Sequence, residues 1–350
     1  MSFTILGTGS ATPSLCKTNH DLAQMMDTSD DWIRTRTGIE QRYLCGEETI
    51  TDLACQAAQK ALDDAGIGAK DLDLILCATV TSDYITPSMA CLVQERLSAG
   101  CPAFDVNAAC TGFLYALDVA DGYFVRGRVK NVLVIGAEAI SKITDWEDRS
   151  TAVIFADGAG AAVLGEGDDL LSVRLTTKGN YRVLQAKNVK GNCPFRSNRP
   201  GGRMDDKDGK KDQALQDGKD DGGVGEEEPA RDNFLYMDGQ EVFRFAVASM
   251  VRDVKQILKD AGISPKDVSY VLPHQANMRI IDFAKSKLEI EDHKFLVNIH
   301  KRGNTSAAAI PVLLDEFRRK GTFKKGDILV LTAFGAGLTT AACAVRWGRD

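Results

Sequence analysis

An internal repeat is the feature that most constrains the fold of this 350-residue chain. The segment DAGIGAKDLDLIL begins at Asp64, and the similar segment DAGISPKDVSYVL begins at Asp260, 196 residues later. At the same separation KNVLVIGAE aligns with GDILVLTAF, which pairs Val132 with Ile328. Two similar segments, each leading from a glycine into an apolar run, predict a duplicated unit.

Each copy alternates helical and strand-like patterns. In the first half we expect a helix over TITDLACQAAQKALDDAG, a strand over LDLILCATV, a helix from Pro87 and a strand over CPAFDV. The second half repeats this order with VFRFAVASMVRDVKQILKDAG, VSYVLPH and FLVNI among its segments. Alternating helices and strands predict an α/β protein with parallel sheets covered by helices. We place its two halves at residues 1–172 and 173–350.

Composition argues against several classes of protein. The chain is 44% hydrophobic and 26% charged, and it has no apolar run near the roughly 20 residues that span a bilayer, so we expect no membrane insertion. The start MSFTILGTGS lacks the features of a signal peptide and indicates a first strand and turn in a cytoplasmic protein. Nine scattered cysteines without CxxC or Cys/His ligand spacing argue against a disulfide scaffold and a metal site. The net charge of −6 argues against nucleic acid as the main partner.

A charged segment interrupts the second half. Residues 203–232 carry eleven acidic and six basic side chains, many glycines and almost no large apolar residues. Such a segment cannot bury enough apolar surface to offset the entropy cost of ordering it. We therefore expect residues 190–232, approximately, to be a mobile insertion, and a solvated insertion without a role is the simplest interpretation.

Two glycine-rich segments give weaker indications. In GTGSAT, residues 7–12, Thr12 stands where a dinucleotide-binding fingerprint needs its third glycine, which argues against a nicotinamide site. The segment DGAGAAVL, from Asp157, lies between apolar runs and predicts a tight turn between strands.

Three polar residues occur where predicted strands give way to helices, which is where reactive groups collect in α/β folds. Cys110 lies in DVNAACTGFLYAL, His274 in VSYVLPHQANMRI and Asn304 in KRGNTSAAAI. At the 196-residue separation, Ser306 is the counterpart of Cys110. Each residue alone is more often structural, since most free cysteines are inert core residues. Together, a thiolate can carry an acyl group while two hydrogen-bond donors hold negative charge on a thioester oxygen.

The segment TSDDWIRTRTGIEQR suggests a nucleotide-binding feature. Ser29 can cap a short helix that Gly38 ends, which makes Trp32 and Arg36 neighbours one turn apart. An indole beside a guanidinium can stack a purine and reach a phosphate. A packed tryptophan with a surface arginine explains the pattern equally well.

The segments FDVNAACTGF, PHQAN and GNTSAA, in this order and spacing, resemble the β-ketoacyl-acyl carrier protein synthase III family. The resemblance extends from the GTGS start to AFGAGL near the end and is interrupted by the insertion. It implies a thiolase-like duplicated αβαβα layered fold with two pseudo-symmetric halves, and an acyltransferase that starts type II fatty acid synthesis. Cys110 would accept the acyl group of an acyl-CoA primer, and His274 and Asn304 would stabilise charge while malonyl-acyl carrier protein loses carbon dioxide. We expect the helix after Cys110 to lower its thiol pKa by about two units.

The resemblance also assigns binding residues. Trp32 and Arg149 would sandwich the CoA adenine, and Arg36 and Thr28 would lie along its phosphates. Gln240 departs from the usual asparagine, which leaves its ligand contact open. Gly239, Phe243 and Asn277 would line the pantetheine tunnel, and Phe334 would pack beside the nucleophile. The backbone N–H groups of Cys110 and Ala336 would donate hydrogen bonds to the oxyanion.

The resemblance further implies a homodimer. Thr86, in SDYITPSMA, holds the position that would reach across the interface to close the acyl pocket. Because threonine is small, we expect longer or branched primers to be accepted beside acetyl, unless neighbours such as Tyr84, Met89 or Leu114 fill the space.

The resemblance implies that an acidic acyl carrier protein docks on the helix after PHQAN, which displays Arg279, Lys285 and Lys287. A solvated basic face is the alternative. No cofactor is expected, because the CoA thioester is itself a substrate. Three other functions stay open: a condensing enzyme of specialised metabolism, a Cys-His-Asn thioester hydrolase of the papain-like order, and a non-catalytic acyl-CoA-binding relative.

Overall fold

The computed structural model describes residues 2–187 and 234–349. Most of the expected insertion at about 190–232 lies outside the described residues. One compact unit comprises residues 1–185 and 235–350 and holds both large sheets. Along the chain, the last strand of the first sheet ends at Gly167, and the first strand of the second sheet begins at Leu170. Both sheets belong to one compact unit. The division into domains at residues 1–172 and 173–350 therefore stays a prediction.

The first sheet has five strands in the order β1-β7-β6-β4-β5. Strand β4 runs parallel to β5 and β6, whereas β7 runs antiparallel to β6 and β1. The strands are β1 (Ser2–Ala11), β4 (Leu74–Ala78), β5 (Ala103–Val106), β6 (Asn131–Ala139) and β7 (Asp157–Gly167).

The second sheet has four strands in the order β11-β12-β13-β8. Strands β11 and β12 are parallel, and β13 runs antiparallel to both of its neighbours. The strands are β8 (Leu170–Thr177), β11 (Tyr270–Pro273), β12 (Ile328–Gly335) and β13 (Thr339–Arg346). The expectation of parallel sheets is therefore wrong for β7 and β13, the one strand in each sheet that runs antiparallel to both of its neighbours.

The segment FLVNI does not form the expected strand. It makes one isolated bridge, between Phe295 and Val271. The side-chain oxygen of Gln275 accepts the backbone N–H groups of Asn298 and Ile299 at 3.0 and 3.1 Å, which takes the donors that a longer strand would use.

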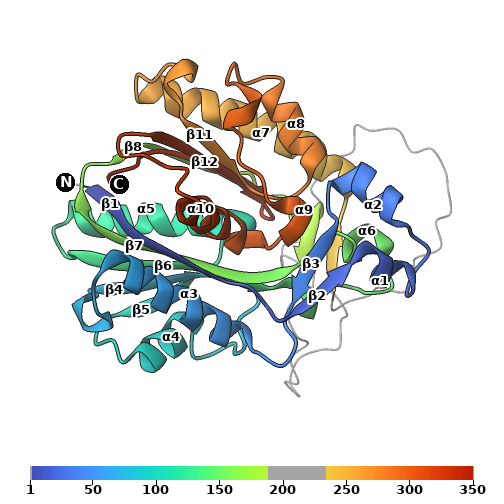
Figure 1. Cartoon of the computed structure of the whole chain (residues 1–350), viewed down its shortest axis with the longest axis horizontal. Coiled ribbons are helices and arrows are strands. Elements are labelled where there is room, and N and C mark those ends of the chain that lie inside the picture. Colours follow the sequence, from blue (N-terminus) through green and yellow to red (C-terminus); the bar gives the residue numbers. More distant parts are fainter. Residues whose placement is uncertain (1, 188–233, 350) are drawn as a thin grey trace, which may run out of the picture. The chain divides into compact units, whose positions relative to one another are not determined.

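The layers follow the expected αβαβα order, which is confirmed (Figure 1). Helices α5 and α10 lie between the two sheets, α3 and α4 cover the outer face of the first sheet, and α7 and α8 cover the outer face of the second. Their bounds are α3 (Ile50–Ala65), α4 (Met89–Leu97), α5 (Gly112–Val125), α7 (Gly239–Asp260), α8 (Met278–Lys285) and α10 (Ala309–Arg319).

Smaller elements surround one end of this core. The helix predicted from Ser29 and Gly38 is confirmed, since Ser29 caps α2 and Gly38 ends it with a φ of 79°. These elements are β2 (Leu15–Thr18), α1 (Asn19–Ala23), α2 (Asp30–Thr37), β3 (Gln41–Leu44), α6 (Arg149–Ala152), β9 (Leu184–Ala186), β10 (Leu235–Met237) and α9 (Ile299–Arg302). Within the described ranges, no helix combines the length and apolar character needed to cross a membrane.

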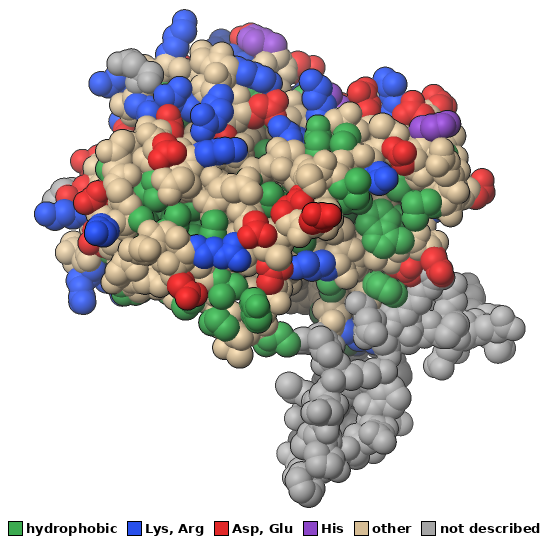
Figure 2. Space-filling view, turned by 60° about the horizontal axis from the view of Figure 1, so that its bottom comes forward, with side chains coloured by type: hydrophobic (Ala, Val, Ile, Leu, Met, Phe, Trp, Pro, Cys, Tyr) green, Lys and Arg blue, Asp and Glu red, His purple; other side chains and the backbone are tan. Residues whose placement is uncertain are grey.

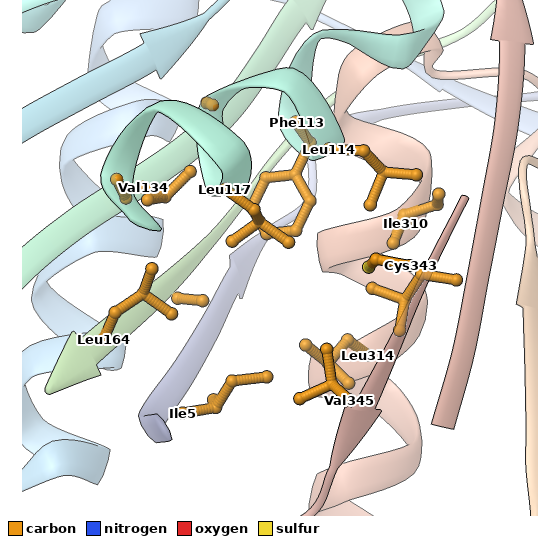
Figure 3. Close-up of a cluster of buried hydrophobic side chains, with 14 of the residues drawn as sticks. Ile5, Phe113, Leu114, Leu117, Val134, Leu164, Ile310, Leu314, Cys343 and Val345 are labelled. Atoms are coloured by element: carbon orange, nitrogen blue, oxygen red, sulfur yellow. The ribbon is translucent and has the colours of Figure 1, made fainter. Parts of the chain in front are cut away.

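The central layer is apolar on both sides. Figure 3 shows Phe113 and Leu117 of α5 facing Ile310 and Leu314 of α10, with Val345 of β13 closing one side. Each such fully buried side chain contributes roughly 1.5–3 kcal/mol. This packing fixes the amino ends of α5 and α10 side by side, and Cys110 and Asn304 lie in the turns that lead into them.

Glycines in the strands permit close helix packing. A Cβ added at Gly9 of β1 would lie 2.2 Å from the Ala57 carbonyl oxygen of α3, and one added at Gly160 of β7 would lie 2.6 Å from the Val312 nitrogen of α10. The turn predicted at DGAGAAVL is therefore wrong, because this segment is a buried strand.

The repeat is present with a shifted register. Leu74 pairs with Val132 in the first sheet, and Tyr270 pairs with Leu329 in the second. The counterpart of Val132 is thus Leu329, one residue beyond the Ile328 that the sequence alignment gives. The short 3-10 turns Ala109–Thr111 and Ser306–Ala308 are also 197 residues apart, so Ala307 rather than Ser306 mirrors Cys110.

Candidate active site

Cys110 lies in the turn between β5 and α5. Ala109 before it has a φ of 47°, a left-handed value that non-glycine residues seldom adopt. The end of β12 reaches this turn, since a Cβ added at Gly335 would lie 2.9 Å from the Cys110 nitrogen. Only glycine at position 335 lets the strand approach the thiol so closely.

The loop of Asn304 reaches Cys110 from the other half. The Asn304 side-chain oxygen accepts the backbone N–H of Ser306 at 2.9 Å, which leaves its amide nitrogen to donate elsewhere. Ser306, with a φ of 51°, interacts through its side chain with the Cys110 thiol and acts to lower the pKa of that thiol. Ser306 is therefore the residue through which this loop contacts the thiol.

His274 directly follows β11 and is almost completely buried. Its backbone N–H donates to the Thr332 carbonyl of β12 at 2.8 Å, and its ring meets the Phe334 ring edge-on at 5.4 Å between centroids. Burial lowers the pKa of His274 to about 3, so the imidazole is neutral at physiological pH. Its buried Nδ1 has no hydrogen-bond partner within the described chain.

Two contacts thus connect the three loops. Ser306 links the Asn304 loop to Cys110, and the Phe334–Gly335 end of β12 touches both the His274 ring and the Cys110 turn. A thiol, a neutral imidazole and a carboxamide at one place can bind an acyl group and stabilise charge on a thioester oxygen. The roles themselves stay predictions.

The pKa of the Cys110 thiol differs from the expectation. Burial raises this pKa to about 11, although the hydrogen bond with Ser306 acts in the opposite direction. The Glu138 carboxylate adds to the increase. The prediction of a lowered thiol pKa is therefore wrong for the free enzyme. Burial destabilises the charged thiolate by more than the nearby hydrogen-bond donors stabilise it.

Glu138 is the residue of this site that sequence reasoning missed. It lies on β6, is fully buried, and accepts a hydrogen bond from the Ser306 hydroxyl at 3.1 Å. Burial raises its pKa to about 7, against several hydrogen bonds that lower it. The available signal was one acidic residue in the otherwise uncharged run VLVIGAEAI.

The proposed nucleotide-binding residues lie close together. The Arg36 and Arg149 guanidinium carbons lie 4.4 and 4.6 Å from the Trp32 ring centroid. An aromatic ring inserted between Trp32 and Arg149 needs a spacing of about 7 Å, twice the van der Waals distance. The expected sandwich around adenine therefore requires Arg149 to move. The hydroxyl of Thr28 is buried and has no partner among the described residues.

The proposed tunnel residues lie on α7 and at the start of α8. Gly239 and Gln240 are exposed in the first turn of α7, and Phe243 is half-buried one turn later. Asn277 caps α8 by accepting the Arg279 N–H at 2.9 Å. The Gln240 backbone N–H donates to the Asp238 carboxylate at 3.0 Å, and the ligand contact of the Gln240 side chain stays a prediction.

The remaining predicted residues are at the surface or beside the strand ends. Ala336 follows β12, and its carbonyl accepts the Thr339 hydroxyl at 2.9 Å. Thr86 and Arg279 are exposed. The expected basic face is weaker than predicted, because Lys285 is mostly buried and pairs with Asp282 at 3.3 Å.

Two further observations limit what the surface can bind. On the face drawn in Figure 2, acidic and basic side chains are interspersed, unlike the single-sign patches that bind nucleic acid. The described residues contain no group of three or more His, Cys, Asp or Glu side chains that could hold a metal ion.

Family models and known proteins agree on the relationship. Residues 104–179 match the model "3-Oxoacyl-[acyl-carrier-protein (ACP)] synthase III", and residues 258–347 match its C-terminal counterpart. The chain is similar to β-ketoacyl-[acyl-carrier-protein] synthase III of Clostridium tetani, with 42% identity over 98% of both chains.

Solved structures show the same likeness. The crystal structure of 3-oxoacyl-[acyl-carrier-protein] synthase III from Aquifex aeolicus superposes with a TM-score of 0.84 at 43% identity, covering 98% of this chain and 99% of that one. A priming β-ketosynthase of the R1128 polyketide pathway superposes with a TM-score of 0.84 at 31% identity, covering 99% and 97%. With identity above 40% to full-length relatives and the duplicated thiolase fold in common, the chain belongs to the β-ketoacyl-[acyl-carrier-protein] synthase III family of condensing acyltransferases.

Proposed function

We propose that this chain condenses an acyl-CoA primer with malonyl-acyl carrier protein, the initiating step of type II fatty acid synthesis. The observation that carries the proposal is that the end of β12 contacts both the His274 ring and the Cys110 turn, while Ser306 of the Asn304 loop interacts with the Cys110 thiol, in a chain of this family. In the first half-reaction the Cys110 thiolate attacks the primer thioester and CoA leaves. The backbone N–H groups of Cys110 and Ala336 are the proposed donors to the oxyanion.

In the second half-reaction malonyl-acyl carrier protein replaces CoA. The neutral His274 imidazole and the Asn304 amide nitrogen donate to the malonyl thioester oxygen, which stabilises the enolate left by loss of carbon dioxide. Preorganised donors of this kind contribute about 3–4 kcal/mol each. The carbanion then attacks the acyl-Cys110 thioester. Because carbon dioxide loss supplies the carbanion, we propose that no cofactor is required.

We also propose a homodimer formed through strand β5. This strand ends its sheet, its residues are only half-buried, and an unpaired strand edge is a template for pairing with a second copy. Beside it, Tyr84 and Ile85 are 59% and 82% exposed. The N–H groups of Met89 and Ala90 bond to Asp105 of β5 at 2.8 Å, which ties the end of this loop to the edge strand.

Thr86 in the same loop is the proposed gate of the partner's acyl pocket. Wild-type enzyme should accept isobutyryl-CoA and a longer primer beside acetyl-CoA, because threonine leaves room that an aromatic ring would fill. Thr86→Phe should restrict acylation to the shortest primers. Acylation rates with the three primers in both proteins test this. Strict acetyl preference in the wild type, or an unchanged chain-length profile in the variant, would remove Thr86 as the gate.

We place the reaction in the cytoplasm. The eight described cysteines are all free, as is typical of a reducing compartment. The carrier protein would dock beside the site, on α8, where Arg279 is exposed.

The test is a product assay. Purified protein is incubated with acetyl-CoA and malonyl-acyl carrier protein, and the carrier is weighed intact. We expect an acetoacetyl carrier, and an acetyl adduct on the enzyme that Cys110→Ser abolishes and Cys16→Ser, at an exposed cysteine, retains. Free acid without condensation would indicate a hydrolase. Condensation on a different acceptor would favour specialised metabolism, which the 31% identity to a priming β-ketosynthase keeps open.

A further inference from the structure

Glu138 is a buried carboxyl group that the reaction described above does not use. Its two oxygens have different partners. Oε2 accepts the Thr81 hydroxyl at 2.6 Å, the Val80 N–H at 3.1 Å and the Thr79 hydroxyl at 3.4 Å, all from the loop after β4. Oε1 instead accepts the Ser306 hydroxyl, at 3.1 Å. The hydrogen bonds of Oε2 hold the loop after β4 in place, which accounts for this half of the carboxylate. This structural role does not account for the hydrogen bond that Oε1 accepts from Ser306.

The Ser306 hydroxyl connects Glu138 to the nucleophile. It donates to Oε1 at 3.1 Å, it also interacts with the Cys110 thiol and acts to lower the pKa of that thiol, and it has only one proton to donate. When Glu138 is charged, this proton lies toward Oε1, and the carboxylate repels a thiolate at Cys110. When Glu138 is neutral, its own proton can point to Ser306, and the Ser306 hydroxyl can donate to the thiolate, which is a stabilising charge-assisted bond.

We propose that Glu138, acting through the hydroxyl of Ser306, controls the ionisation of Cys110 and hence the pH range in which the enzyme accepts an acyl group. Ionisation can occur within the pair. The S–H bond breaks, Ser306 Oγ takes that proton and passes its own to Oε1, so the products are a thiolate and a neutral carboxyl with unchanged net charge. Glu138 and Ser306 are thus positioning residues for the nucleophile, and the inference rests on Cys110 being the nucleophile of the proposed reaction.

The residues around Glu138 indicate that it changes charge, and so affects Cys110 ionisation, near neutral pH. Burial raises the pKa of Glu138 to about 7. Cys77 on β4 also interacts electrostatically with Glu138, and burial raises the pKa of Cys77 well above its usual value, so Cys77 stays protonated. Among the described residues, no lysine, arginine or histidine is paired with Glu138. The coupled pair of Glu138 and Cys110 therefore titrates without a nearby cation.

The test measures alkylation of Cys110 by iodoacetamide from pH 5.5 to 9, read at the Cys110 peptide by mass, with exposed Cys16 as the internal reference. In the wild type the rate should rise with pH and then level off above about pH 7, once Glu138 becomes charged. Glu138→Gln, a neutral mimic, should match the wild type at low pH and keep rising. At pH 8, one unit above the pKa of Glu138, alkylation of the Glu138→Gln variant should be up to about tenfold faster than alkylation of the wild type.

Ser306→Gly should have the opposite effect. It removes the donor to the thiolate, so alkylation should be roughly tenfold slower throughout. Glycine also suits the left-handed backbone at position 306, which protects the fold. Asp157→Asn is the matched control, because Asp157 is equally buried but bonds to Ser141 and Cys45 instead. Its profile should follow the wild type.

Two results would overturn the proposal. One is a Glu138→Gln profile that levels off like the wild type, and the other is a Ser306→Gly rate equal to that of the wild type. Alkylation needs neither CoA nor a carrier protein. Failure to form a β-ketoacyl carrier would therefore count against the proposed function and would leave this result interpretable on its own.

Discussion

Burial changes the protonation of each ionisable side chain in the site. It lowers the pKa of His274, so the imidazole is a neutral donor over the whole physiological range. It raises the pKa of Cys110 and of Glu138, so the thiol is protonated in the free enzyme and the carboxyl titrates near neutrality. Because His274 is already neutral, we expect no acid-side loss of decarboxylation from its titration above pH 5.

The two side-chain donors should affect one half-reaction. His274→Ala and Asn304→Ala should each slow malonyl decarboxylation by about 10²–10³-fold and acylation by acetyl-CoA much less, because each removes a donor to the enolate oxygen. Carbon dioxide release and enzyme acylation are measured separately. His293→Ala, at an exposed histidine, is the control. Equal losses in both steps would contradict this division of roles.

At the scale of elements, helices approach strands wherever strands carry glycine. Gly160→Ala should destabilise the protein by roughly 1–3 kcal/mol, because the new Cβ strikes the backbone of α10 and neither element can shift freely. Gly122→Ala is the matched control. It lies inside α5 with no atom within 4 Å of the added Cβ, and should stabilise by about 0.5–1 kcal/mol.

Urea unfolding of the two variants measures both effects. If Gly160→Ala proves as stable as the wild type, the helix–strand contact is not as close as described. A destabilised Gly122→Ala would show that position 122 is constrained by something other than the helix.

Helix α8 should affect only the carrier-dependent step. Arg279→Glu should slow condensation with malonyl-acyl carrier protein by roughly tenfold at low ionic strength and leave acetylation by acetyl-CoA unchanged, because charge reversal slows association with an acidic partner. Adding salt should shrink the difference. Lys325→Glu is the control, since Lys325 is exposed just before β12, at the end opposite the site. An unaffected carrier step at low salt would rule out docking at Arg279.

At the scale of the whole molecule, the proposed dimer forms through the edge strand β5 and the loop beside it. Ile85→Arg should convert dimer to monomer at micromolar concentration, because it places a charge on an apolar side chain that a second copy would cover. Val125→Arg changes another apolar side chain, 66% exposed, at the far end of α5, and should stay dimeric. Sedimentation velocity distinguishes the species. A monomeric wild type, or an Ile85→Arg variant that remains dimeric, would contradict assembly through this edge.

The sequence alone determined the local boundaries and the candidate chemistry. Capping is a property of neighbouring residues, so Ser29, Gly38 and Gly66 correctly predicted where α2 begins and where α2 and α3 end. The repeat correctly predicted duplication. The residue types of Cys110, His274 and Asn304 indicated acyl-transfer chemistry, and their roles stay predictions.

Only the tertiary structure decided what depends on residues far apart in the chain. The pairing of β7 with β1, the pairing of β13 with β8, and the close approach of α10 to Gly160 join segments more than a hundred residues apart. The same is true of Glu138. Its pKa and its link to Cys110 exist only because β6 and the Ser306 turn bury one carboxyl group between the two halves, and burial and long-range hydrogen bonds leave no pattern in the local sequence.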